Sequence, residues 1–262
     1  DWSSDVCSSD LQNTLNLRRE ELAAQGVAYL GLMLEYATNT NRPVWQVRRG
    51  SDQFFTRVDL EAKTADLVRI LTDEFARLEK AGVHTAIWSN EYIGQRHQFV
   101  LPALKALEAK GITVEIQCYV RRHDDLARSA YAQWGLKYRN YEGPILPFSA
   151  WVGQRSGGFL ASGAMLAHWV AAFGAGVRVF NYDAIPDVVA HFLTVNGVQA
   201  LPAEDDNVSP GAAMTAVQSV FNNMWLGKTP EAEFAKVERA ITQVDQTGAT
   251  LPRMDRLLPS EA

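Results

Sequence analysis

Arg121 and Ser129 carry the most informative chemistry in this sequence. They lie in the segment VRRHDDLARSAY, residues 120–131, where Arg121 directly follows a continuous apolar run and Ser129 comes eight positions later. An arginine presents a rigid fork of N–H donors that suits a phosphate, and a serine in the first turns of a helix can donate to the same anion. The spacing is therefore compatible with one phosphate site. The alternative is that Arg121 ends a strand in solvent and that Ser129 faces water, and the residues alone favour this alternative.

Alternating strand-like and helical patterns predict the frame that holds these two residues. Short apolar runs predict strands at 27–30, 83–89, 112–120 and 177–180. Apolar residues spaced by three and four positions, such as Leu67, Leu71 and Leu78, and stop signals such as Gly26 and Gly82 predict helices at 12–25, 60–80, 102–110, 125–138, 160–173, 187–195, 212–225 and 231–244. Strands separated by helices are typical of an α/β fold with a parallel sheet flanked by helices.

Three short segments follow predicted strands and are therefore candidates for a site. Ligands of open parallel sheets bind beyond the carboxyl ends of the strands. The segments are Ser89-Asn90-Glu91, Arg121-Arg122-His123 and Asn181-Tyr182-Asp183.

Glu91 is the best candidate for a general base, because a carboxylate at that edge can accept a proton from a bound hydroxyl. The alternative for Glu91 is a solvent-facing loop carboxylate. His97 and His123 are reserve candidates, and His123 lies beside Arg121, whose charge disfavours the imidazolium.

Composition excludes several classes of protein. The formal net charge is −5 and no Lys/Arg run occurs, which argues against a nucleic-acid partner. No apolar stretch reaches the length of a membrane span, so a cytoplasmic protein is expected. The five histidines form no HxH or HExxH pair, and Cys118 lies in an apolar run as a buried strand thiol would; no metal site is predicted.

The first eleven residues, DWSSDVCSSDL, have the composition of a solvated tail and match a reading-frame translation of a common sequencing adapter. We therefore predict that residues 1–11 are non-native and leave them out of the fold. Residues 12–248 are predicted to form a single α/β domain, followed by a tail at 249–262.

The Arg121 segment resembles the 3′-phosphate-binding motif of sulfotransferases that use 3′-phosphoadenosine 5′-phosphosulfate. In that family an arginine at a strand end and a serine eight residues later bind the 3′-phosphate of the donor. The resemblance gives these roles to Arg121 and Ser129, and Asp125, Ala127 and Tyr131 also fit the pattern. The sequence departs from the family at 122–123, where Arg-His stands in place of the usual Asn-Pro.

Two weaker matches extend the resemblance to most of residues 12–200, closest to bacterial sulfotransferase-like proteins. The segment VFNYDAIPDVVAHFLTVNGV is similar to a later strand and helix of the family, and Ser89-Asn90-Glu91 is similar to a Ser-Ser-Glu turn. The resemblance implies a P-loop-NTPase-like sulfotransferase fold that lacks its first strand and phosphosulfate loop. Some members use a glutamate as base, which is the role implied for Glu91. Without the lysine of the phosphosulfate loop, the chain is expected to be inactive.

The implied reaction transfers a sulfuryl group to a hydroxyl or amine, on a carbohydrate or small-metabolite acceptor. One alternative is a P-loop kinase or nucleotide-binding enzyme, which would need a Walker-type Gly-Lys-Ser/Thr and a strand-ending aspartate. Another is a noncatalytic accessory domain in surface-polysaccharide assembly. The loops at 38–50 and 138–158 are expected to shape the acceptor pocket, but their composition does not identify the acceptor, and the sequence also leaves the oligomeric state open.

Overall fold

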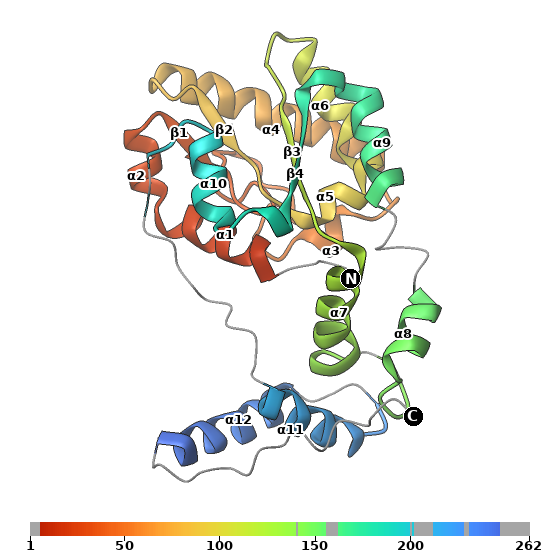
Figure 1. Cartoon of the computed structure of the whole chain (residues 1–262). Coiled ribbons are helices and arrows are strands. Elements are labelled where there is room, and N and C mark those ends of the chain that lie inside the picture. Colours follow the sequence, from red (N-terminus) through yellow and green to blue (C-terminus); the bar gives the residue numbers. More distant parts are fainter. Residues whose placement is uncertain are drawn as a thin grey trace. The chain divides into compact units, whose positions relative to one another are not determined.

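The computed structural model describes residues 6–139, 141–155, 162–199, 201, 212–227 and 231–246 (Figure 1). The chain divides into two compact units. The first comprises Asp1–Arg122 and Ala161–Asn207, and the second comprises His123–Leu160 and Val208–Ala262. The mixed helix and strand content confirms the predicted α/β class. The limits of the predicted single domain, 12–248, remain a prediction, and the predicted tail at 249–262 lies outside the described residues.

Four short strands form two parallel ladders in the first unit. β1 (Val27–Tyr29) pairs with β2 (Thr85–Ile87), and β3 (Ile116–Val120) pairs with β4 (Val177–Asn181). β2 and β3 are shorter than predicted at their starts because the preceding helices end in Schellman-type turns. The Val83 N–H donates to the Leu78 carbonyl at 2.9 Å, and the Ile112 N–H donates to the Leu107 carbonyl at 3.2 Å. These residues therefore finish helices and do not start strands.

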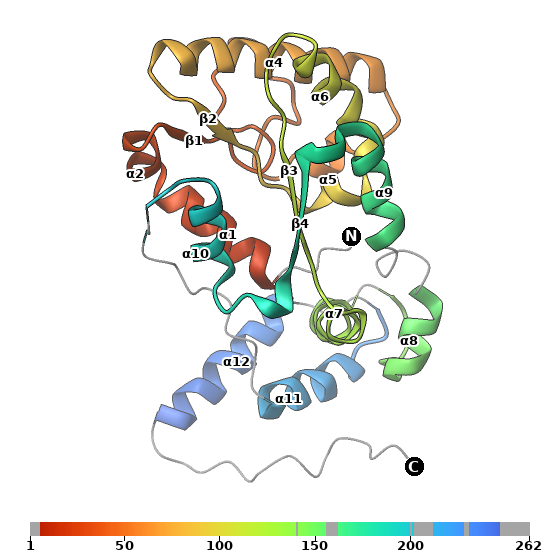
Figure 2. The same cartoon turned by 45° about the horizontal axis from the view of Figure 1, so that its top comes forward.

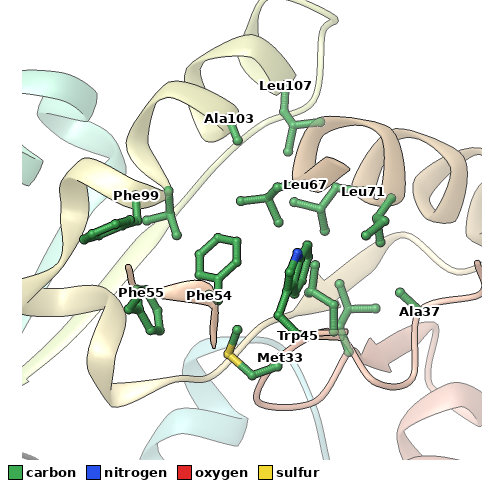
Figure 3. Close-up of a cluster of buried hydrophobic side chains, with 14 of the residues drawn as sticks. Met33, Ala37, Trp45, Phe54, Phe55, Leu67, Leu71, Phe99, Ala103 and Leu107 are labelled. Atoms are coloured by element: carbon green, nitrogen blue, oxygen red, sulfur yellow. The ribbon is translucent and has the colours of Figure 1, made fainter. Parts of the chain in front are cut away.

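Three helices cover one face of the strands: α4 (Leu60–Lys80), α6 (Leu101–Glu108) and α9 (Ser162–Phe173). Their apolar residues form a cluster, here called the α4-side core, around Trp45, Phe54 and Leu67 (Figure 3). Residues from all four strands, namely Ala28, Ala86, Ile116 and Val177, pack against this cluster. The two ladders therefore lie in one layer.

The opposite face is covered by α1 (Val6–Leu17), α2 (Arg19–Ala24) and α10 (Val188–Val195), as Figure 2 shows. Leu15, Leu22 and Leu193 are fully buried in this second cluster. Val27 and Tyr29 of β1 point into it while Ala28 between them meets the α4-side core, as the two-residue period of a strand requires. Helices on both faces of parallel strands are the arrangement that the sequence predicts.

The first helix differs from the prediction at both ends. One helix was expected at 12–25, but α1 begins at Val6, and α2 begins at Arg19 after a break at Arg18. Leu11, within the segment predicted to be non-native, is buried in the same cluster as Val189 and Leu193 of α10. The adapter origin of this segment remains a prediction. Gly26, with φ of 75°, ends α2 as expected.

The remaining elements of the first unit are short. They are α3 (Ser51–Phe54), α5 (Glu91–Gln95), η1 (His97–Phe99), η3 (Gly174–Gly176) and η4 (Tyr182–Ala184). Helices of four or five residues span too few turns to show a period, which is why the sequence does not reveal α3 and α5. No helix among the described parts of the chain is both long and apolar enough to cross a membrane.

The second unit contains helices only, within its described residues. They are α7 (His123–Ala130), η2 (Tyr131–Lys137), α8 (Phe148–Arg155), α11 (Ala212–Asn223) and α12 (Glu231–Gln246). The predicted helix at 125–138 changes at Tyr131 into the π-helical η2. The Tyr131 ring packs so close to Gly135 that a Cβ there would lie 2.3 Å from it, so glycine permits the wider turn. The guanidinium of buried Arg139 donates to the Trp225 and Gly227 carbonyls, each at 2.6 Å.

A stacked histidine pair joins η1 to α9 and makes the stability of the first unit depend on pH. The His97 and His168 rings lie 4.0 Å apart between centroids, and His97 Nδ1 is buried with no hydrogen-bond partner among the described residues. Burial, and then the charge of His168, lower the pKa of His97. The unfolded chain therefore binds more protons near and below the ordinary pKa of histidine. The contribution of neutral His97 to the unfolding free energy is therefore complete above about pH 6.5. It is lost as the pH falls through the lowered pKa of His97 in the folded chain.

We expect His97→Phe to reduce the fall in unfolding free energy between pH 8 and pH 5, measured by urea titration. His84→Gln, at an exposed histidine, controls for the loss of an imidazole. An unchanged fall in the His97 variant would contradict this account.

Candidate functional site

Glu91 lies where the sequence predicts it, at the start of α5 and four residues after β2. Asn90 fixes this turn from both sides. Its side chain accepts from the Tyr92 N–H at 2.9 Å and donates to the Leu32 carbonyl at 2.6 Å. An asparagine in this role satisfies an open N–H at the helix start. Because Leu32 follows β1, Asn90 ties the ends of the two paired strands together.

A cavity of about 310 Å³ opens beside Glu91 in the first unit. Its lining contains two arginines, two carboxylates and a tyrosine, together with one serine and one leucine: Leu32, Arg48, Arg49, Ser51, Asp52, Glu91 and Tyr92. The volume lies at the lower end of the range for small-molecule sites. The cavity therefore has the size of a small-molecule site.

Residues of α1 hold two of the charged groups in place. Gln12 Nε2 donates to Glu91 Oε2 at 2.9 Å, and Arg48 Nη2 donates to Asn13 Oδ1 at 3.2 Å. The pKa of Tyr29, at the end of β1, depends on the charges around it. Burial raises its pKa, the charges of Glu35 and Glu91 act in the same direction, and Arg48 opposes them. Glu91 and Arg48 therefore both act on the end of β1.

Arg121 directly follows β3, as predicted, and meets a second predicted segment. Its Nε lies 3.4 Å from Asp183 Oδ1, and its guanidinium carbon lies 5.1 Å from the centre of the Tyr182 ring. The backbone N–H of Arg122 donates to Asp183 Oδ2 at 2.7 Å. The Val120–Asn181 pairing in the β3–β4 register brings these segments together. Both segments were candidates because each follows a predicted strand, but the contact between Arg121 and Asp183 was not predicted.

The Nε atom of Arg121 keeps donor capacity despite this ion pair. It is buried and has no hydrogen-bond partner among the described residues, so its contact with Asp183 is an ion pair without hydrogen-bond alignment. An orphaned buried donor on a guanidinium is a feature that an anion with several acceptor oxygens can satisfy. Arg121 thus fits a phosphate ligand, in competition with the Asp183 carboxylate.

Ser129 lies in α7 of the second unit and is half-buried. Arg121 belongs to the first unit. Their predicted convergence on one phosphate therefore remains a prediction.

His123, a reserve base, is exposed at the start of α7. Over the described ranges, no three histidine, cysteine or acidic side chains come together as a metal site would require. The thiol of Cys118 is half-buried in β3, and burial raises its pKa to about 11.

Comparisons with known proteins leave the family of this chain open. No family model matches the chain, and no curated protein or solved structure matches it.

Sequence reasoning did not find the arginines of the cavity. Arg48 and Arg49 lie in WQVRRGSD, between a buried tryptophan and a glycine, in a stretch without regular elements. The sequence signal that could have indicated a site here is a pair of arginines between two anchoring residues. Gln12 and Asn13 were assigned to a helix without any role at a site.

Asp183→Asn is expected to strengthen the predicted binding of a nucleotide phosphate at Arg121 about two- to fivefold, because a partly exposed ion pair is worth up to about 1 kcal/mol. Asparagine retains an oxygen for the Arg122 N–H and removes the charge that competes for the guanidinium. Calorimetric titration with adenosine 3′,5′-bisphosphate measures the effect. Weaker binding by the variant would show that Asp183 orients Arg121 toward the ligand and does not compete with it.

Proposed function

We propose that this chain is a sulfotransferase-like protein that binds 3′-phosphoadenosine 5′-phosphosulfate, with Arg121 and Ser129 on the 3′-phosphate. The observation that carries the proposal is the buried, unsatisfied Nε of Arg121 directly after a parallel strand. The proposed fold lacks its first strand, and the division of the strands into two ladders is compatible with that. A cytoplasmic location and a carbohydrate or small-metabolite acceptor belong to the same proposal.

The donor would supply the sulfuryl group for in-line transfer to an acceptor oxygen or nitrogen: the bond from sulfur to the 5′-phosphate oxygen would break, and adenosine 3′,5′-bisphosphate would leave. Arg121 and Ser129 hold its 3′-phosphate and so fix its position, which is the main task of a protein in transfers of this kind. In a protein that also carries the phosphosulfate-loop lysine, Glu91 would take the proton of the acceptor hydroxyl on Oε1, while Gln12 holds Oε2. The cavity beside Glu91 receives the acceptor.

Ligand discrimination tests the nucleotide part of the proposal without any need for turnover. The chain should bind adenosine 3′,5′-bisphosphate about tenfold or more tightly than adenosine 5′-monophosphate, because only the former carries the 3′-phosphate. Isothermal titration calorimetry of both ligands at one ionic strength gives the ratio. Equal affinities would contradict the proposal, and a preference for magnesium-bound ATP would favour the kinase alternative.

A further inference from the structure

The loop at 45–50 is anchored at both ends. Trp45 is 3% exposed and packs on Phe54 with ring centroids 4.7 Å apart (Figure 3). Gln46 is fully buried, and its side-chain amide donates to the Leu34 carbonyl at 2.8 Å and the Ala37 carbonyl at 3.0 Å. The loop therefore begins in the core.

Gly50 closes the same loop against its own beginning. A Cβ at this position would lie 1.8 Å from the Trp45 carbonyl oxygen, so only glycine allows the approach. The next residues form α3, which buries Phe54 in the α4-side core. A loop held in this way presents its intervening side chains in a defined direction at a low entropic cost.

The side chains that this loop presents are Arg48 and Arg49. Both are exposed residues that line the cavity, and Asn13 holds Arg48 from α1. Asp52 of α3 and Glu91 of α5 line the same cavity. Two guanidinium groups and two carboxylates give a lining with no net charge. The two neighbouring guanidinium groups offer donors for one carboxylate, and the two carboxylates accept hydrogen bonds from hydroxyl groups.

We propose that this cavity binds a single sugar unit that carries a carboxylate. The carboxylate pairs with Arg48 and Arg49, for which a guanidinium fork has the matching geometry, and the sugar hydroxyls face Glu91 and Asp52. The volume of about 310 Å³ accommodates one ring. The claim that this sugar is the acceptor rests on the proposed function. The claim that the cavity binds an acidic sugar does not.

Binding of D-glucuronate to the full chain tests this inference, with D-glucose as the neutral control of the same size. We expect glucuronate to bind about tenfold more tightly than glucose, as measured by ligand-observed NMR titration. The double variant Arg48→Gln/Arg49→Gln should reduce glucuronate binding to the level of glucose. Arg57→Gln, at an exposed arginine that does not line the cavity, is the matched control and should leave glucuronate binding unchanged.

Three results would overturn the inference. They are equal binding of the two sugars, full binding by the double variant, and tighter binding of D-glucose 6-phosphate, since the last would replace the carboxylate by a phosphate dianion. Circular dichroism of the double variant checks that it is folded. A parallel titration with adenosine 3′,5′-bisphosphate separates the two proposals: loss of sugar binding alone rejects the acidic sugar, and loss of nucleotide discrimination alone rejects the donor.

Discussion

Arg121→Ala is expected to weaken the binding of adenosine 3′,5′-bisphosphate by about 10- to 100-fold, with little effect on adenosine 5′-monophosphate. Hydrogen bonds between a charged donor and a charged acceptor are worth about 1.5–3 kcal/mol each in net terms, and only the bisphosphate has the group that Arg121 would bind. The folded state should tolerate the change, since the ion pair with Asp183 is partly exposed, with 29% and 21% side-chain exposure for the two residues. Calorimetric titration of both nucleotides provides the measurement.

Arg122→Ala is the matched control for this variant. It removes the same charge from the neighbouring exposed position and keeps the backbone N–H that donates to Asp183. A general loss of positive charge would weaken both ligands in both variants, whereas a specific contact affects the bisphosphate in the Arg121 variant alone. Equal losses of bisphosphate affinity in the two variants would show that Arg121 contributes only to the overall positive potential and makes no specific contact.

Trp45→Ala should lower the free energy of unfolding of the first unit by about 3–5 kcal/mol, the range for removing a large buried aromatic side chain. Trp45 contributes a ring to the α4-side core, and its loss would leave a cavity against Phe54. Because whole domains are stable by only about 5–15 kcal/mol, the transition should move visibly in urea. We also expect weaker glucuronate binding, since the loop with Arg48 and Arg49 loses its anchor.

Val44→Ala provides the control one position earlier. Val44 is 80% exposed, so its truncation should change the unfolding free energy by no more than about 0.5 kcal/mol. Urea unfolding followed by circular dichroism compares both variants with the parent chain. A loss below about 1 kcal/mol for Trp45→Ala would show that the loop does not depend on this ring.

The sequence predicts the regular elements well where their period extends over several turns or where glycine ends them. The helix predicted at 60–80 is α4 with the same limits, because its apolar face repeats over 21 residues and Gly82 follows it. The strand starts at 83 and 112 were wrong because the backbone N–H groups there bond to helix carbonyls. Local patterns do not show which partner a backbone group takes.

The candidate site was predictable only in part. The segments of Arg121 and Asp183 were candidates because each follows a predicted strand, whereas the ion pair between the two residues was not predicted. Arg48 and Arg49 were not found, because their position depends on contacts of Trp45, Gln46 and Gly50 with residues from 34 to 54. Irregular loops are fixed by such tertiary contacts and not by a sequence period.

A double-mutant cycle on Arg121 and Ser129 tests the central claim most directly, since that claim places both residues on one phosphate. Each alanine variant should weaken the binding of adenosine 3′,5′-bisphosphate and leave the binding of adenosine 5′-monophosphate unchanged. The double variant should lose less than the sum of the single losses, with a coupling of about 0.5–3 kcal/mol. Purely additive losses, or a Ser129→Ala variant that binds the bisphosphate as tightly as the parent chain, would contradict the shared phosphate site.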